Sequence, residues 1–126
     1  MKNVKKMLMI PVLFSLVSCY SSSGSYVTKM CVTTQNDHSF SMSYDYLKGY
    51  KTFVYNIKAN TEIDVDFKTE SGKLSCTIKA KDGDYVYRGN EIETSSFKIV
   101  IPNDGKYEFR YDAEEHKGSF SCSWTK

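Results

Sequence analysis

The chain has 126 residues, of which 17 are basic, 15 are acidic and 14% are aromatic, and its formal net charge is +2. Three basic residues and no acidic residue lie within residues 1–18, so residues 19–126 hold 14 basic and 15 acidic side chains, a net charge of −1. This balance excludes the basic surface that nucleic-acid binding requires, and we expect no nucleic acid as a partner.

The beginning of the chain predicts a cleaved signal peptide and a lipid anchor. Three lysines within the first six residues precede an apolar stretch over 7–17, which is too short to span a bilayer, where roughly twenty residues are needed. Residues 16–19 read Leu-Val-Ser-Cys, and this tetrapeptide resembles the lipobox of bacterial lipoproteins. The resemblance implies cleavage after residue 18, acylation of Cys19, and a membrane-anchored place in the cell envelope, facing the periplasm or the exterior. An ordinary secretory signal cut nearby is the alternative.

The sequence divides into three parts. Residues 1–18 are the expected signal peptide. Residues 19–25 read Cys-Tyr-Ser-Ser-Ser-Gly-Ser, which we interpret as the lipidated cysteine and a flexible, uncharged tether. Residues 26–126 form the expected folded domain, whose length fits a single domain with a modest core.

From residue 26 onward, apolar and polar residues alternate with the period of a β-strand, and no helical period is present. The clearest segment is 61–68, where Ile63, Val65 and Phe67 alternate with charged residues. Ser71-Gly72 and Asp82-Gly83 are typical of turns between strands. The segments that we expect as strands are 26–33, 40–46, 50–58, 61–68, 73–80, 85–88, 95–101, 107–111 and 118–124.

Many short alternating strands predict an all-β fold, a single antiparallel β-sandwich of about eight or nine strands. Over residues 72–124, a turn glycine, Asp-Gly, a tyrosine strand, Ser-Phe, Asp-Gly-Lys-Tyr and Gly-Ser-Phe follow one another. This order is similar to that of jelly-roll sandwich modules such as the Golgi-dynamics and CUB-like domains. The resemblance implies a jelly-roll-like fold with a binding or spacer role rather than catalysis.

Three cysteines remain besides Cys19. Cys76 and Cys122 each lie in phase with apolar neighbours of their strand, so we expect both to point into the core. Residue parity therefore favours a Cys76–Cys122 disulfide, which is plausible outside the cytoplasm. A Cys31–Cys122 disulfide and three buried free thiols are the alternatives.

The sequence offers little that is typical of catalysis. His38 lies in a polar connection, and His116 follows Glu114 and Glu115, where it could contribute to a weak metal site. We interpret residues 112–117 instead as a charged, solvent-exposed loop, because no second histidine has matching spacing. We expect no enzymatic activity, no metal and no cofactor.

Exposed tyrosines are the remaining candidate site. By strand parity, Tyr85 and Tyr87 share one face beside Arg88, and tyrosines on a flat sheet suit sugar stacking or protein recognition. We therefore select Tyr85, Tyr87 and Arg88 as a possible ligand face.

Together these observations predict a lipid-anchored, non-catalytic envelope lipoprotein that binds a protein partner or acts as a structural module. A carbohydrate- or peptidoglycan-binding module is the alternative, favoured by the tyrosines. An inhibitor of an envelope enzyme ranks third, since it would need a projecting loop, for which residues 112–117 are the candidate. The expected partners are the membrane, through lipid at Cys19, and an envelope protein or polysaccharide.

Overall fold

The computed structural model describes residues 20–125, so the expected signal peptide and Cys19 lie outside the described residues. Its elements in chain order are β1 (Tyr20–Lys29), β2 (Val32–Asn36), β3 (Ser39–Ile57), β4 (Glu62–Ala80), β5 (Tyr85–Gly89), β6 (Ser95–Val100) and β7 (Gly105–Trp124). All the pairings are antiparallel. The described part of the chain contains no helix with the length and apolar character that crossing a membrane would require.

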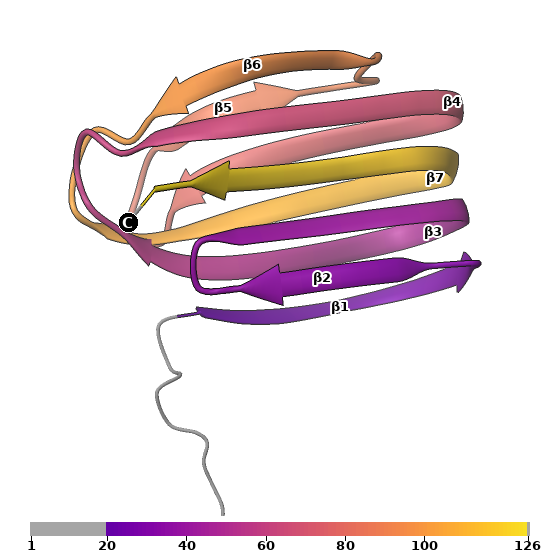
Figure 1. Cartoon of the computed structure of the whole chain (residues 1–126), viewed down its shortest axis with the longest axis horizontal. Coiled ribbons are helices and arrows are strands. Elements are labelled where there is room, and N and C mark those ends of the chain that lie inside the picture. Colours follow the sequence, from indigo (N-terminus) through magenta and orange to yellow (C-terminus); the bar gives the residue numbers. More distant parts are fainter. Residues whose placement is uncertain (1–19, 126) are drawn as a thin grey trace, which may run out of the picture.

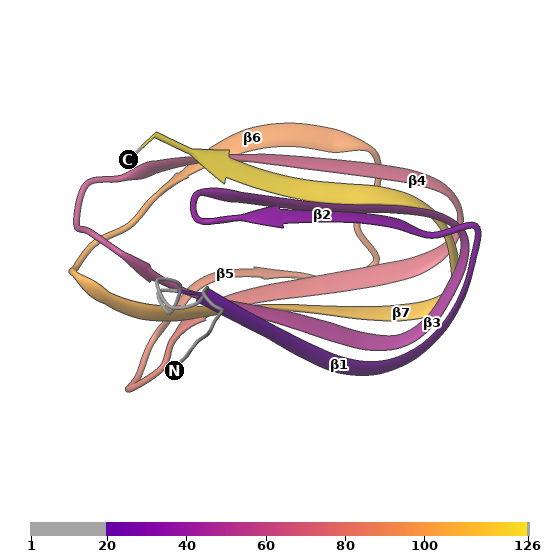
Figure 2. The ribbon, with the colours of Figure 1, turned by 60° about the horizontal axis from the view of Figure 1, so that its bottom comes forward.

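Three long strands determine the shape of the molecule. β3, β4 and β7 have 19, 19 and 20 residues, and each bends in its middle and continues in a second layer (Figure 2). The pairing registers shift at these bends, between residues 44 and 49 of β3 and between residues 69 and 73 of β4. The result is one sheet folded over into a β-sandwich, closed by the bends at one end, which we call the bend end.

The fold-over gives two layers with the same central order. We call the first the β6 layer: β2, the first half of β3, the second half of β7, the first half of β4, and β6. The β5 layer contains β1, the second half of β3, the first half of β7, the second half of β4, and β5. β1 begins at the end of the sandwich opposite the bends, which we call the open end (Figure 1).

The all-β antiparallel sandwich is as predicted, but the strand count differs for a physical reason. Three pairs of expected strands, on either side of Lys48-Gly49, Ser71-Gly72 and residues 112–117, are the two halves of single bent strands. The expected strand at 26–33 is divided between β1 and β2. Turn residues thus mark bends as well as hairpins, because both require a local departure from the extended backbone.

The inward-facing phase changes at each bend. In β4, Val65 and Phe67 are buried before the bend, and Leu74 and Cys76 are buried after it. An irregular residue pair in each bend shifts the phase by one, as a β-bulge does. Each half-strand therefore presents its apolar residues to the same central core, although their parity differs.

Aromatic rings fill the space between the layers. Tyr111, from the first half of β7, stacks on Phe120, from its second half, with ring centroids 3.7 Å apart. Phe40 stacks on Phe53 at 4.1 Å, and Trp124 packs edge-on against Tyr55 at 4.8 Å. The first two contacts each join the two halves of one strand, the third joins β7 to β3, and all three fix the layers face to face.

The expectation of a flexible tether is corrected over residues 20–25. Residues 20–25 are the first part of β1, paired with residues 50–55 of β3. Serine and glycine are weak strand formers, but pairing along an existing edge satisfies their backbone groups and overrides the local preference. β1 therefore begins at Tyr20, the residue that follows Cys19.

Candidate functional site

The cysteines lie where parity placed them, but they are not joined. Cys76 and Cys122 are both buried, and they are free thiols, as is the half-buried Cys31. The hydroxyl of Tyr111 faces both buried thiols and lies 3.4 Å from Sγ of Cys122. Burial raises the pKa of Cys122 to about 12 and that of Cys76 well above its usual value, so neither thiol is a nucleophile at neutral pH.

The three residues of the expected ligand face do not act together. A register shift in the β4–β5 pairing places Tyr85 opposite Lys79 and Tyr87 opposite Ile78. Tyr87 consequently turns inward and packs against Phe97, with ring centroids 5.2 Å apart. Simple alternation put both tyrosines on one face, and the bulge reverses one of them.

Tyr85 and Arg88 remain together on the outer face. The Arg88 guanidinium lies 4.5 Å from the centroid of the Tyr85 ring, and Lys79 Nζ lies 5.7 Å from it. Tyr85 is 47% exposed. Its ring is therefore in contact with cations rather than an open stacking platform.

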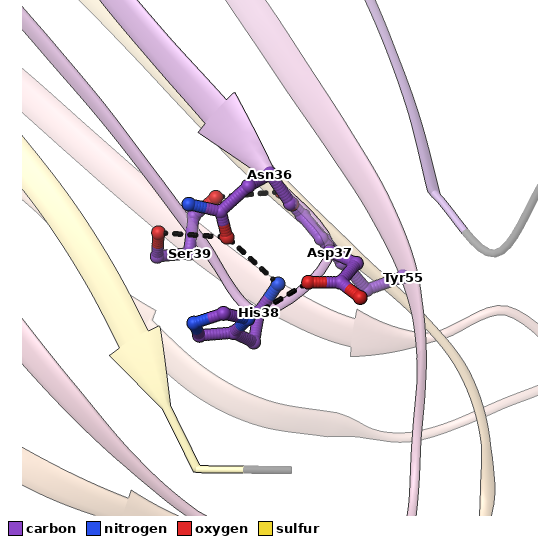
Figure 3. Close-up of polar contacts among 5 residues, drawn as sticks. All are labelled: Asn36, Asp37, His38, Ser39 and Tyr55. Carbon is purple, nitrogen blue, oxygen red and sulfur yellow. Dashed lines mark hydrogen bonds and ion pairs between the residues drawn. The ribbon is translucent and has the colours of Figure 1, made fainter. Parts of the chain in front are cut away.

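His38 lies in the turn between β2 and β3 and is exposed (Figure 3). Its Nδ1 lies 2.8 Å from Asp37 Oδ1, and its backbone N–H donates to Asn36 Oδ1 at 3.0 Å. The Ser39 hydroxyl donates to the same Asn36 oxygen, and the buried Tyr55 hydroxyl donates to the Asn36 carbonyl at 2.8 Å. These hydrogen bonds satisfy polar groups of the turn and hold its conformation.

His116 differs from its expected place in an exposed loop. Residues 112–117 lie within β7, and the His116 side chain is fully buried at the bend end. Its Nε2 lies 2.9 Å from Thr69 Oγ1, and its Nδ1 lies 2.8 Å from the Tyr44 hydroxyl. It therefore joins the three bent strands. The projecting loop that an inhibitor would need at these residues does not exist.

The outer face of the β5 layer carries a row of polar side chains that sequence analysis missed. Tyr50 of β3 pairs with Asp112 of β7, which pairs with Ser75 of β4. The Ser75 hydroxyl donates to Asn90 Oδ1 at 2.8 Å. This row, which we call the Tyr50–Asn90 row, crosses three strands and the segment after β5.

A fixed arginine supports the row. Arg110 donates from Nε and Nη2 to the two carboxylate oxygens of Asp112, at 3.0 and 3.1 Å. Its guanidinium also lies 4.3 Å from the centroid of the Tyr50 ring. The Asp112 carboxylate raises the pKa of Arg110 further through this hydrogen bond, so the three side chains hold one another in position.

A groove lies over the Tyr50–Asn90 row, near the bend end. Its volume is about 440 Å³, and its walls carry two lysines, Lys48 and Lys73, and two glutamates, Glu91 and Glu114. Within residues 20–125, none of these four side chains forms an ion pair. The floor of the groove is thus held by side-chain contacts, and its walls carry charges of both signs that are not ion-paired within residues 20–125.

Two other hollows lie at the open end. One of about 690 Å³ is lined mainly by the turns that follow β4 and β6, and one of about 350 Å³ lies beside Trp124. Among the described residues, no group of three or more histidine, cysteine or carboxylate side chains is placed to hold a metal ion.

Comparison with known proteins gives a likeness of fold. No family model matches the chain, and no curated protein matches its sequence. A similar solved structure is PliG, a periplasmic lysozyme inhibitor of g-type lysozyme from Aeromonas hydrophila. It is 14% identical, with 92% of this chain and 95% of PliG covered and a TM-score of 0.49.

Two further similar structures are TmCBM61 in complex with β-1,4-galactotriose and a family 29 carbohydrate-binding module. Each is 12% identical with a TM-score of 0.44. The comparison covers 86% of this chain and 89% of TmCBM61, and 85% of this chain and 76% of the family 29 module.

Proposed function

We propose that this chain is a lipid-anchored, non-catalytic binding module of a bacterial cell envelope. The observation that carries the proposal is the outer face of the β5 layer. There, the Tyr50–Asn90 row and the groove above it are built on paired strands, which hold side chains more precisely than loops do. Its ligand is another component of the envelope.

One histidine and two thiols that could serve in acid–base or nucleophilic catalysis are held in the interior of the described structure. Both ring nitrogens of His116 are hydrogen-bonded inside the protein. The thiols of Cys76 and Cys122 are buried with raised pKa values. These assignments support binding rather than chemistry as the role of the module.

The anchor rests on the lipobox-like residues 16–19 and fits the fold. β1 begins at Tyr20, directly after Cys19, and its start lies at the open end of the sandwich (Figure 1). The groove lies near the opposite end, beside the bends of β3 and β4, where Lys48, Gly49 and Lys73 line it. A lipid on Cys19 would hold the open end against the membrane and leave the groove facing away from it.

Fractionation of cells that produce the Cys19→Ala chain tests the anchor. We expect the variant to leave the membrane fraction or to accumulate as the uncleaved precursor, because two or three acyl chains supply most of the membrane affinity. A variant that stays in the membrane with the mass of the wild-type protein contradicts the anchor.

Site-specific photo-crosslinking in intact envelopes tests the binding face. A photoreactive residue at Thr77, on the outer face of the β5 layer, should give a defined adduct with one envelope component. The same residue at Lys98, on the outer face of the β6 layer, is the matched control and should give none. Equal adducts from both positions, or adducts from Lys98 alone, would assign binding to another surface.

A further inference from the structure

We infer that the groove over the Tyr50–Asn90 row is a binding site for a polyhydroxylated carbohydrate of two or three sugar rings. This inference rests on the proposed binding function and names its ligand class. It places the site on side chains other than Tyr85, Tyr87 and Arg88. The groove, at about 440 Å³, falls within the range of roughly 300–1,000 Å³ of small-molecule sites.

The floor of the groove offers donors and acceptors side by side. Each Asp112 oxygen accepts one bond from Arg110, and each retains a further lone pair for a ligand hydroxyl. The Asn90 amide oxygen accepts from Ser75, so the N–H groups of the same amide remain as donors to a ligand. Vicinal hydroxyls of a sugar, each both donor and acceptor, match this alternation.

The charged side chains on the walls of the groove disfavour ligands whose charges are all positive or all negative. Lys73 lies opposite Glu114 in the β4–β7 pairing, yet the two are not ion-paired, and Lys48 and Glu91 add one further charge of each sign. A polyanion would meet the carboxylates of Glu91, Asp112 and Glu114, and a polycation would meet the ammonium groups of Lys48 and Lys73. A neutral ligand rich in hydroxyls can bond to all four side chains.

The same side chains are a poor match for a protein partner. The centre of a protein interface is depleted of charge and relies on aromatic anchors that fill pockets. Here the groove is lined by ionic groups, and the ring of Tyr50 is already covered by Arg110. Of the exposed apolar residues, Val27 lies opposite Lys48 at the β1 side of the groove, whereas Met30 and Val32 are not among the residues that line it.

The side chains at the floor of the groove require little ordering when a ligand binds. Arg110, Asp112 and Tyr50 are fixed by mutual contacts. The segment that carries Asn90 and Glu91 is held by the Ile92 N–H, which donates to the Leu74 carbonyl at 2.8 Å. A preformed floor lowers the entropy cost of binding.

The test is a titration of the full chain, purified in a detergent without a sugar headgroup, with soluble oligosaccharides. The probes are cellotriose, mannotriose, chitotriose and a disaccharide peptidoglycan fragment. Their binding is measured by calorimetry and by amide chemical shifts. We expect at least one probe to bind and to shift the amides of Tyr50, Asn90 and Asp112. Shifts centred on Trp124 or on β2, which lies in the other layer, would overturn the inference.

Matched variants locate the site. Asn90→Ala and Lys73→Ala should each weaken binding of that probe at least tenfold, and Lys98→Ala on the opposite outer face should leave it unchanged. All three side chains are exposed, so we expect the three variants to fold as the wild-type chain does. Binding that survives both groove substitutions, or the failure of every probe to bind, overturns the carbohydrate assignment. If the Thr77 adduct is then a protein, the module still binds through this face and only the ligand class is wrong.

Discussion

The hydroxyl of Tyr44, on β3, lies 2.8 Å from Nδ1 of His116, on β7, where both strands bend. The direction of this bond follows from the other side of the ring. Thr69 Oγ1 donates to the Ile92 carbonyl at 2.8 Å, so it accepts from His116 Nε2–H at 2.9 Å. Nδ1 is therefore unprotonated and accepts the Tyr44 hydroxyl proton.

This arrangement predicts that the free energy of unfolding falls in mild acid. Burial lowers the pKa of His116 below its usual 6.5, so in the folded state the ring binds a proton less readily than in the unfolded state. The stabilising contribution is present above pH 6.5 and is lost as the pH falls below 6.5 through the folded pKa. For one group the slope is at most about 1.4 kcal/mol per pH unit.

Urea unfolding at pH 5.5 and pH 8 measures this slope. His116→Gln should have a lower free energy of unfolding than wild type at pH 8. Between pH 5.5 and pH 8, the free energy of unfolding of this variant should change much less than that of wild type. His38→Ala is the control, because His38 is exposed, and it should keep the wild-type slope. An unchanged slope in His116→Gln would assign the pH dependence to other groups.

Two bend glycines should be intolerant of alanine. A Cβ at Gly118 would lie 1.9 Å from the Lys68 carbonyl oxygen, and one at Gly72 would lie 2.0 Å from that of Glu115, where Gly72 also has a φ of 78°. Each substitution should lower the free energy of unfolding by at least about 1–3 kcal/mol, because rigid backbone must move. Chemical denaturation measures the loss.

Gly83→Ala is the matched control for the bend glycines. A Cβ at Gly83 meets nothing within 4 Å, and its φ is not positive. This substitution should leave stability within about 1 kcal/mol of wild type, on the stabilising side. If all three variants behave alike, the bends do not depend on close backbone approach.

Period-two alternation was sufficient to predict the class of the fold and most of the core. Ile63, Val65 and Phe67 are buried as their phase predicts, and Cys76 and Cys122 point inward. These predictions have one cause in common: in a half-strand with one buried face, the alternation of apolar and polar residues indicates which side chains face the core.

The bends were not predictable in the same way, because turn residues serve both hairpins and bends. Ser71-Gly72 reads as a turn, yet β4 continues through it into the second layer. His116 is in phase with the buried Phe120, Cys122 and Trp124. That phase was the available signal for its burial, and its charged neighbours obscured it.

The groove depends on residues that are distant in sequence. Tyr50, Ser75 and Asp112 meet only because β3, β4 and β7 pair in one layer. Nothing local to Asp112 distinguishes it from an ordinary residue of a polar connection. The bulge that turns Tyr87 inward is likewise set by the β4–β5 pairing, so strand parity alone misplaced it.

Tyr85 and Tyr87 should differ in their effect on stability. Tyr87 packs on Phe97 beside the core, so Tyr87→Ala should lower the free energy of unfolding by about 1–3 kcal/mol. Tyr85→Ala removes exposed contacts with Arg88 and Lys79 and should cost less than about 1 kcal/mol. Thermal and urea unfolding of the pair decide the matter. Equal losses would contradict the bulge and restore a shared face.

Thiol labelling distinguishes buried free thiols from a disulfide. At pH 8, without reductant, a maleimide should label the half-buried Cys31 in the folded protein and leave Cys76 and Cys122 unlabelled, because both are buried with raised pKa values. In denaturant, the three should all react, and mass spectrometry counts them. Labelling of Cys31 alone after denaturation would show that Cys76 and Cys122 are joined by a disulfide. Labelling of a fourth thiol would mean that Cys19 is present and carries no lipid.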